Sequence, residues 1–260
     1  MKSLADKTII LTGAAGGFGQ EFVKQLLALG SRLIITDTDL QSLTEITDQI
    51  AESQYPGSVL GLIEANLSTD AGCEHLYQES KKIAPHIDML INNAGVITFG
   101  YYHECPQSRW ESLMQINILA PMRLTYRFLP DMLARGQGHI VFISSCAGLV
   151  GTAHSVPYSA SKFALRGFGM SLSGEVKTEG IDITIIYPSW VKTPLLDIEV
   201  NGSANVKTLT SLIAGSPGRI VANSIKGIRR RQLHVYPRID AKIIHLGSKV
   251  TPIVGSMRRN

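Results

Sequence analysis

Long apolar runs, paired cysteines and zinc-ligand motifs are all missing from this 260-residue chain. No apolar stretch approaches the roughly 18 residues that a membrane-spanning helix needs, and the first residues contain no apolar signal core. We therefore expect neither a membrane span nor a secretory signal. Cys73, Cys105 and Cys146 lie far apart and form no Cys-x-x-Cys pair. This indicates reduced thiols in a cytoplasmic protein, with no disulfide frame and no bound metal.

Acidic residues are scarce at the C-terminal end. Residues 219–260 contain ten Lys or Arg and one acid, Asp240, whereas the rest of the chain holds 15 basic and 20 acidic residues. Within residues 239–260 the basic side chains mix with Ile, Leu, Val and Met, and two glycines and a proline break any long helix. Such a basic and apolar tail fits docking on the body or on a neighbouring subunit, or else weak contact with an anionic membrane surface. It lacks the interleaved aromatics of a nucleic-acid-binding module, so we expect no nucleic-acid partner.

Strand-like and helix-like segments alternate along most of the chain. Several apolar runs are continuous Ile, Val and Leu blocks, the pattern of parallel strands covered on both faces. We predict strands at 7–12, 32–36, 58–63, 88–92, 139–144, 182–187 and 232–236. We predict helices at about 18–29, 40–53, 69–83, 107–134, 156–179 and 217–230. The alternation indicates an α/β fold, a doubly wound Rossmann-type parallel sheet with helices on both faces, formed by a single domain over residues 1–238.

Tyr158 and Lys162 are the most informative pair, because Ser145 lies thirteen residues before Tyr158. Positions i and i+4 share one helix face, so the phenol and the ammonium point the same way. A nearby cation favours the phenolate, and lowering the pKa of a tyrosine from about 10 to about 7 takes roughly 4 kcal/mol. A tyrosine tuned in this way exchanges a proton with a hydroxyl or carbonyl group at neutral pH. Tyr77 and Lys81 have the same spacing without a matching serine, and we interpret them as an ordinary exposed helix face.

Two further polar positions accompany this pair. Ser144 lies beside Ser145, but strand alternation sends Ser144 to the opposite face and favours Ser145 as the partner of the pair. Asn117 lies inside a long predicted helix, four residues before Pro121. Because proline has no N–H, the carbonyl of Asn117 is left free for a water or another donor. Asn117 is therefore a candidate for holding a water in a proton relay, the alternative being a kink with no further role.

A glycine-rich turn follows the first predicted strand. Gly13 and Gly17 lie between that strand and the first predicted helix, and Gly19 lies at the start of the helix. Glycines at these positions allow a tight turn and let the backbone approach a pyrophosphate at the helix N-terminus. A glycine turn needed only for packing is the alternative.

Asp37 ends the second predicted strand and follows Gly13 by 24 residues. A carboxylate there accepts hydrogen bonds from the adenosine ribose hydroxyls and repels a 2′-phosphate. Neither Thr38 nor Gly16 supplies a cation that would bind the phosphate. NAD is therefore favoured over NADP, unless Asp37 only begins a turn.

In their order and spacing these motifs resemble the short-chain dehydrogenase/reductase family. The resemblance covers about residues 7–236 and rests on Thr12 to Gly19, Asn92-Asn93-Ala94-Gly95, Asn117, Ser145, Tyr158 with Lys162, and Pro188. It implies that Tyr158 is the catalytic acid/base and that Ser145 holds the substrate oxygen. It further implies that Lys162 binds the nicotinamide ribose and lowers the pKa of Tyr158, and that Asn117 holds a relay water. The implied cofactor-binding residues are Gly13, Gly17, Phe18, Gly19, Asp37, Asn66, Leu67, Asn93, Ala94, Gly95, Tyr158, Lys162, Pro188, Val191 and Thr193.

Two positions depart from the family pattern. Asn66 stands where an Asp usually faces the adenine amine, although an amide oxygen still accepts that bond. Ser189 and Trp190 follow Pro188 where glycine is usual, and serine restricts the backbone more than glycine does. The apolar segment 190–215 is expected to cover the substrate, with simple packing against the body as the alternative. We interpret His154 and Cys146 as parts of the pocket wall.

We therefore expect an NAD-dependent oxidoreductase that transfers a hydride between nicotinamide and a secondary alcohol or ketone of apolar character. The resemblance also implies a homodimer or homotetramer built on the helices at 107–134 and 156–179. A sugar-nucleotide epimerase or dehydratase shares the Tyr/Lys pair but normally needs a longer chain. A cofactor-binding regulator without turnover would be expected to lose Tyr158, Ser145 or Lys162, and all three are present.

Overall fold

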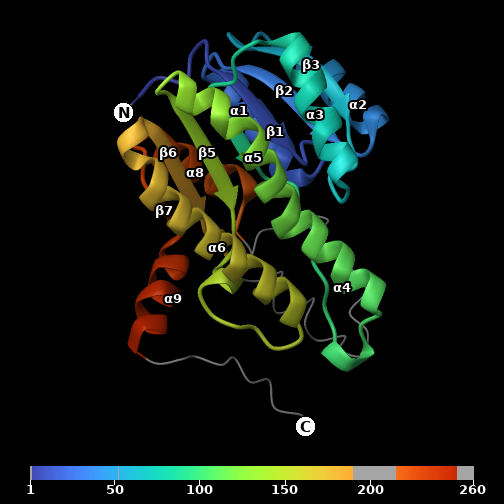
Figure 1. The fold of residues 1–260 in the computed structure, drawn as a ribbon, viewed down its shortest axis with the longest axis vertical. Coiled ribbons are helices and arrows are strands. Elements are labelled where there is room, and N and C mark those ends of the chain that lie inside the picture. The colour runs from blue at the N-terminus through green and yellow to red at the C-terminus, as the bar shows by residue number, and fades with distance from the viewer. Residues whose placement is uncertain (1, 52, 190–214, 251–260) are drawn as a thin grey trace.

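A computed structural model of the chain describes residues 2–51, 53–189 and 215–250 (Figure 1). Its centre is a seven-stranded sheet in the order β3-β2-β1-β4-β5-β6-β7, in which every neighbouring pair is parallel. The strands are β1 (Thr8–Thr12), β2 (Arg32–Asp37), β3 (Ser58–Glu64), β4 (Met89–Asn92), β5 (Gly138–Ile143), β6 (Ile181–Ile186) and β7 (His234–Val235). The predicted doubly wound parallel sheet is confirmed, although the last strand is shorter than the predicted 232–236.

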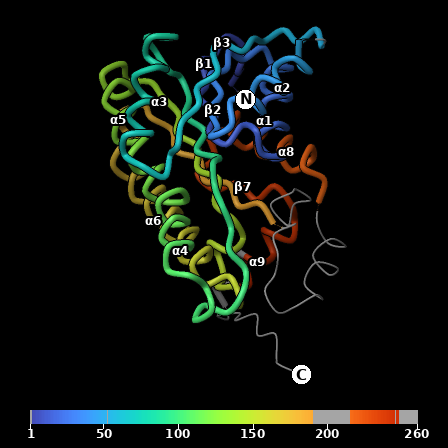
Figure 2. Tube along the Cα trace, turned by 90° about the vertical axis from the view of Figure 1, so that its right-hand side faces the viewer, coloured from blue at the N-terminus to red at the C-terminus, as the bar shows by residue number. Residues whose placement is uncertain are grey.

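Helices cover both faces of this sheet. They are α1 (Gly17–Ala28), α2 (Leu40–Ala51), α3 (Asp70–Ile83), α4 (Gln107–Met114), α5 (Ala120–Ala134), α6 (Val156–Val176), α8 (Pro217–Arg229) and α9 (Ile239–Val250). Short helical turns are η1 (Tyr102–Glu104), η2 (Gln115–Leu119), η3 (Cys146–Gly148) and η4 (Lys177–Glu179). Figure 2 shows α3, α5 and α6 on one side of the sheet and α1, α2 and α8 on the other. Among the described residues, no helix combines the length and the apolar character that crossing a membrane requires.

Alternation along the strands divides the core into two apolar clusters. Ile10 of β1 packs with residues of α3, α5 and α6, whereas its neighbours Ile9 and Leu11 pack with residues of α1, α2 and α8. Both side chains of each such pair are buried because successive strand residues point to opposite faces and each face carries helices. The continuous Ile and Leu runs of the sequence follow from this two-sided burial.

The predicted helix at 107–134 is not a single α-helix. It consists of α4 and α5 joined by η2, one turn of π-helix. Pro121 is the second residue of α5 and lacks the N–H that a regular α-helix would need there, and π turns occur where the i→i−4 ladder is interrupted in this way. The irregularity inferred at Asn117 is thus present.

The C-terminal segment contains an element that was not predicted. Residues 239–250 form α9, although we interpreted this stretch as a tail broken by glycine and proline. Gly247 lies inside the helix, and Pro252 lies beyond its end. Ala241 is fully buried and Ile244 packs on the core, so this part of the segment docks on the body.

Candidate active site

The carboxyl ends of the central strands bring together residues from distant parts of the chain. The strand order changes direction between β1 and β4, the position at which parallel α/β sheets open a ligand crevice. Thr12 joins the two strand ends: its Oγ1 accepts hydrogen bonds from the N–H groups of Asn93 and Ala94, each 3.0 Å away. The Asn93 side-chain amide donates to the carbonyls of Thr12 and Gly13, at 2.9 and 3.0 Å. Two predicted cofactor-binding segments are therefore held as one rigid edge.

The glycine turn has the geometry of a close backbone crossing. Gly13 adopts φ +67°, and a Cβ on it would lie 2.7 Å from the Cα of Ala94. A Cβ on Gly19 would lie only 2.1 Å from the carbonyl oxygen of Gly13. Both positions therefore require glycine.

The N-terminus of α1 fits an anionic group. The helix begins at Gly17, and its cap residue, Gly16, contributes no side-chain hydrogen bond. The first N–H groups of the helix, including that of Phe18, are thus left for a ligand. Such donors, combined with the positive end of the helix dipole, suit a pyrophosphate, so these residues fit a dinucleotide cofactor.

Asp37 lies at the end of β2 against the same turn. Its Oδ2 accepts a hydrogen bond from the N–H of Ala15 at 2.9 Å, and its Oδ1 accepts one from the N–H of Thr38 at 2.8 Å. The carboxylate is thus oriented by the glycine turn, and the side chain of Thr38 is exposed beside it. The alternative interpretation, in which Asp37 only begins a turn, accounts for the bond from Thr38 but not for the bond from Ala15.

Ser145 and Tyr158 meet above the end of β5. Ser145 is the N-cap residue of η3, and its Oγ accepts a hydrogen bond from the N–H of Ala147 at 3.1 Å. Its hydroxyl also forms a hydrogen bond with the phenol of Tyr158, in the first turn of α6. Ser144 is buried and donates instead to the backbone carbonyl of Lys162 at 3.0 Å. The preference for Ser145 over Ser144 agrees with this geometry.

Lys162 lies under Tyr158 with its side chain almost fully buried. Its Nζ is 5.6 Å from the centre of the Tyr158 ring, within the range of a cation–π contact, and donates to the carbonyl of Ile143 at 2.9 Å. A Cβ on Gly95 would lie 3.5 Å from this Nζ and 3.3 Å from Asn117 Oδ1. The backbone at Gly95 therefore passes close to both polar groups.

Asn117 acts as a clamp between two elements. Its Oδ1 accepts from the N–H of Val96 at 2.9 Å, while its Nδ2 donates to the carbonyl of Val96 at 2.9 Å and to Ser161 Oγ at 3.1 Å. Ser161 in turn donates to the backbone carbonyl of Tyr158 at 2.7 Å. Asn117 thereby connects the segment after β4 to the helix that carries Tyr158 and Lys162.

The pKa of Tyr158 is shifted in the direction opposite to the one that the family resemblance implies. Burial raises the pKa of the Tyr158 phenol above its usual range, and the hydrogen bond with Ser145 acts in the opposite direction. The lowered pKa implied by the family resemblance is therefore absent in the protein alone, because desolvation outweighs the neighbouring groups. Burial also lowers the pKa of Lys162 to about 8, so its ammonium is still mostly protonated at neutral pH.

The side chain of Asn66, which we expected to face the adenine, is already engaged within the protein. The Oδ1 of Asn66 already accepts hydrogen bonds from the N–H and the hydroxyl of Ser68, at 3.1 and 2.7 Å. A contact from Asn66 to adenine would have to compete with both of these bonds. Leu67 is buried beside it. Pro188 accepts from the N–H of Cys146 at 2.9 Å, which ties the end of β6 to η3.

Some predicted residues lie outside the part of the chain that the structure describes. These are Val191, Thr193, Trp190 and nearly all of the predicted covering segment. Ser189 is described, and its hydroxyl is buried without a hydrogen-bond partner among the described residues. The ring of His154 packs edge-on against Tyr101, and its backbone φ is +61°.

The second Tyr/Lys pair is structural, and our interpretation of it as an exposed face was wrong. The ring of Tyr77 packs edge-on against Phe128 with ring centres 5.0 Å apart, and Lys81 forms an ion pair with Asp131. The (i, i+4) spacing orients both side chains toward α5, because α3 and α5 pack together.

Two of the three cysteines have thiols that are shielded from solvent. All three are free, and burial raises the pKa of Cys146 to about 12 and that of Cys73 to about 11. Thiols of this kind are poor nucleophiles at neutral pH. Within the described residues, no group of three or more His, Cys, Asp or Glu side chains could hold a metal ion.

Sequence reasoning missed two contributors, Thr12 and Ser161. Thr12 was noted only as the first residue of the glycine motif, yet its hydroxyl joins two strand ends. Ser161 lies one turn after Tyr158 and connects it to Asn117. Ser161 could have been found from the sequence, because a small polar residue three positions after Tyr158 lies on the same helix face.

Comparison with known proteins agrees with this geometry. The family model described as short chain dehydrogenase matches residues 7–204. Epidermal retinol dehydrogenase 2 of Mus musculus is 32% identical over 259 residues, a match that covers 97% of this chain and 80% of the mouse protein.

Solved structures share the fold. A short chain dehydrogenase/reductase from Burkholderia phymatum in complex with NAD has a TM-score of 0.85 at 21% identity and covers 99% of this chain and 100% of its own. A metagenomic short-chain oxidoreductase in complex with NADP has a TM-score of 0.74 at 25% identity, with coverages of 91% and 99%. The chain therefore belongs to the short-chain dehydrogenase/reductase family of NAD(P)-dependent oxidoreductases.

Proposed function

We propose that this protein is an NAD-dependent dehydrogenase that oxidises an apolar secondary alcohol, or reduces the corresponding ketone. The observation that carries the proposal is the contact of Ser145 with Tyr158 above the buried ammonium of Lys162. This arrangement provides a proton donor and acceptor, a hydroxyl to orient an oxygen atom, and a positive charge in one place.

Tyr158 handles the proton at the substrate oxygen. Its raised pKa keeps the phenol protonated, which suits proton donation to a ketone oxygen during reduction. In the oxidation direction the phenolate accepts the proton of the alcohol, and the nearby Lys162 ammonium stabilises that charge. The position of Tyr158 in the first turn of α6 adds the positive end of the helix dipole.

Ser145 orients the substrate oxygen. One lone pair of its Oγ is occupied by the N–H of Ala147, which fixes the hydroxyl direction. The hydroxyl hydrogen can then donate to Tyr158 or to a substrate oxygen between the two side chains. Asn117 and Ser161 hold α6 against the segment after β4 and so keep this spacing constant.

The cofactor would be held along the carboxyl edge of the sheet. The turn at Gly13 and the N-terminus of α1 would bind its pyrophosphate, and Asn93, Gly95 and Lys162 would border the nicotinamide end. When bound, the nicotinamide supplies or accepts the hydride. Asp37 supports NAD over NADP, because its carboxylate would repel a 2′-phosphate.

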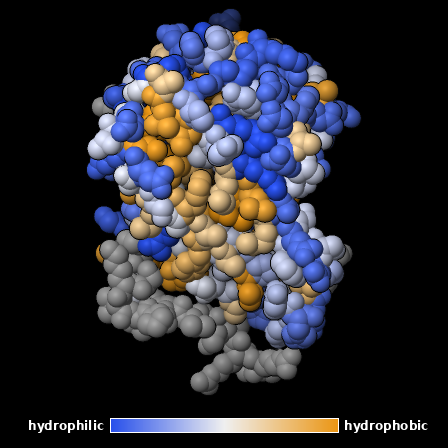
Figure 3. All heavy atoms as spheres, viewed as in Figure 1, coloured by the Kyte–Doolittle hydropathy of each residue, from blue (hydrophilic) through white to orange (hydrophobic). Residues whose placement is uncertain are grey.

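An apolar substrate is supported by two features. The mouse relative is named a retinol dehydrogenase, and the segment at 190–215 is rich in Leu, Ile and Val. We also propose a homodimer or homotetramer. The surface over α5 and α6 exposes Met122, Tyr126, Val156, Phe163 and Met170, and Figure 3 shows apolar side chains gathered over these helices.

Substitution of Tyr158 by Phe tests the proposal. This change keeps the ring but removes the proton, so turnover of secondary alcohols with NAD should fall at least about 100-fold while the affinity for NADH stays nearly unchanged. A panel of secondary alcohols and ketones, followed by the absorbance of the reduced nicotinamide, provides the measurement.

Tyr77→Phe is the matched control, because Tyr77 has the same spacing to a lysine but packs against Phe128 of α5. It should leave turnover unchanged. Full activity in the Tyr158→Phe variant would refute the mechanism. Cofactor binding without turnover of any substrate in the wild type would favour a regulatory role.

A further inference from the structure

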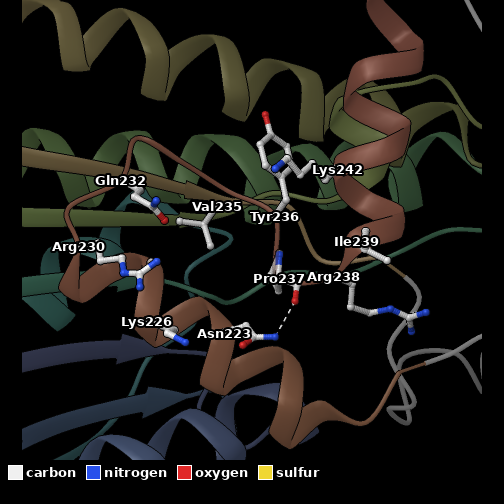
Figure 4. Close-up of a pocket in the computed structure, with 11 residues that line it drawn as sticks. Asn223, Lys226, Arg230, Gln232, Val235, Tyr236, Pro237, Arg238, Ile239 and Lys242 are labelled. Carbon is white, nitrogen blue, oxygen red and sulfur yellow. Dashed lines mark hydrogen bonds between the residues drawn. The ribbon is translucent and has the colours of Figure 1, made fainter. Parts of the chain in front are cut away.

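The basic residues near the C-terminus gather around one cavity. A hollow of about 320 Å³ lies between the end of α8, β7 and the start of α9. Lys226 and Arg230 line it from the α8 side, and Arg238, Ile239 and Lys242 line it from the α9 side, as Figure 4 shows. None of the described residues that line it is acidic. Four of the ten basic residues in 219–260 therefore share one surface.

Most of this charge is uncompensated. Lys226 of α8 and Arg230, the C-cap residue of that helix, lie one turn apart and are exposed, as is Lys242. No carboxylate of the described residues forms an ion pair with any of these three, whereas Arg238 pairs with Asp240 at 3.0 Å. Cations that line a cavity without acidic partners raise the local potential and favour an anion.

An exposed apolar ridge borders the cavity. Ile239, Ile243 and Leu246 are 79%, 62% and 54% exposed, and their spacing places them on one face of α9. The opposite face holds α9 to the body through the buried Ala241 and through Ile244. Ile239 belongs both to the ridge and to the cavity wall. α9 also packs against η3, the turn that follows Ser145.

We propose that the cavity and the ridge together form a docking surface for an anionic phospholipid bilayer. The cations bind headgroup phosphates, and the ridge enters the boundary between headgroups and acyl chains. A bilayer offers negative charge and hydrocarbon side by side, which matches the two halves of this surface. A soluble phosphate would use only the cavity, and it would leave three large apolar side chains in water.

Vesicle sedimentation with the full chain tests this docking. Vesicles with 30% phosphatidylserine in phosphatidylcholine should bind the protein, and pure phosphatidylcholine vesicles should bind it much more weakly. Lys226→Gln combined with Arg230→Gln should lower partitioning by roughly 30-fold, since each basic residue near an anionic surface contributes about fivefold. Ile243→Gln combined with Leu246→Gln keeps good helix formers and should lower partitioning at least about tenfold.

Matched controls change equivalent exposed residues elsewhere. Lys24→Gln with Lys177→Gln, and Leu40→Gln, should leave partitioning within about twofold of the wild type, and all variants should retain NADH binding. Equal binding to both kinds of vesicle, or to neither, overturns the proposal. Calorimetry with inorganic phosphate tests a soluble anion as the ligand. If phosphate binds saturably and the Ile243→Gln, Leu246→Gln variant partitions to vesicles like the wild type, the cavity binds a soluble anion and the bilayer proposal is wrong. A changed oligomeric state in the ridge variant assigns the ridge to a second copy of the chain and also overturns the docking surface.

Discussion

Exchange of Asp37 for Ala together with Thr38 for Arg should turn the cofactor preference toward NADP. The Asp37 carboxylate is held against the glycine turn by the N–H groups of Ala15 and Thr38, at 2.9 and 2.8 Å, so it cannot easily swing away from a 2′-phosphate. Two unit charges about 5 Å apart repel by roughly 3 kcal/mol at an effective dielectric of about 20, and partial exposure reduces this to about 1–2 kcal/mol.

Removal of the Asp37 charge should therefore strengthen NADP binding by roughly 5- to 30-fold. An arginine at the exposed position 38 adds a charge-assisted pair of similar size, because the planar guanidinium suits a phosphate. NAD binding should weaken in the same variant, since the carboxylate that accepts from the ribose hydroxyls is lost. The ratio of the two cofactor affinities should change by at least about 100-fold.

Fluorescence titration of the wild type and the variants with NADH and NADPH measures this ratio. Asp39→Asn is the control, since Asp39 is an exposed neighbour whose carboxylate is occupied by Ser42 at the start of α2. It should change the ratio less than about threefold. If the wild type already prefers NADPH, or if Asp39→Asn acts as strongly as the double variant, the argument from the position of Asp37 is wrong.

Two further predictions concern the buried polar groups of the site. Burial lowers the pKa of Lys162 from 10.5 to about 8, so the unfolded chain binds more protons than the folded protein between these values, and stability rises with pH there. Between pH 8 and 10 the free energy of unfolding of the wild type, measured with urea, should rise by roughly 2 kcal/mol because of Lys162, and Lys162→Met should remove this rise. If the variant keeps the same dependence on pH, the charge of Lys162 is not buried in the way that we describe. Asn117→Ala removes three hydrogen bonds and should lower the free energy of unfolding by about 2–4 kcal/mol. Its control is Gln115→Ala in the same π-helical turn, where the side-chain oxygen has no partner among the described residues, and equal losses in both variants would refute the clamp.

Local features of the sequence determined most of the fold and the identity of the site residues. Strands covered on both faces appear as unbroken Ile, Val and Leu runs, and Gly19 needs to be glycine for a local reason, because a Cβ there would meet the carbonyl oxygen of Gly13. The spacing of Tyr158 and Lys162 places both on one helix face, because the α-helical repeat is a local property. The irregular winding before Pro121 could be inferred for the same reason, since it depends on a single missing N–H.

The tertiary structure decided what those residues do to one another. Tyr77 and Lys81 repeat the spacing of the site pair, yet packing against α5 makes them part of a helix contact. Burial raises the pKa of Tyr158 and lowers that of Lys162, and the extent of desolvation depends on every element that covers them. The helix α9 likewise forms across Gly247 because Ala241 and Ile244 dock on the body, and this brings Arg238 and Lys242 to the same cavity as Lys226 and Arg230. Contacts between distant segments, and the low dielectric that these contacts create, exist only in the folded protein. The spacing of residues along the sequence therefore cannot predict them.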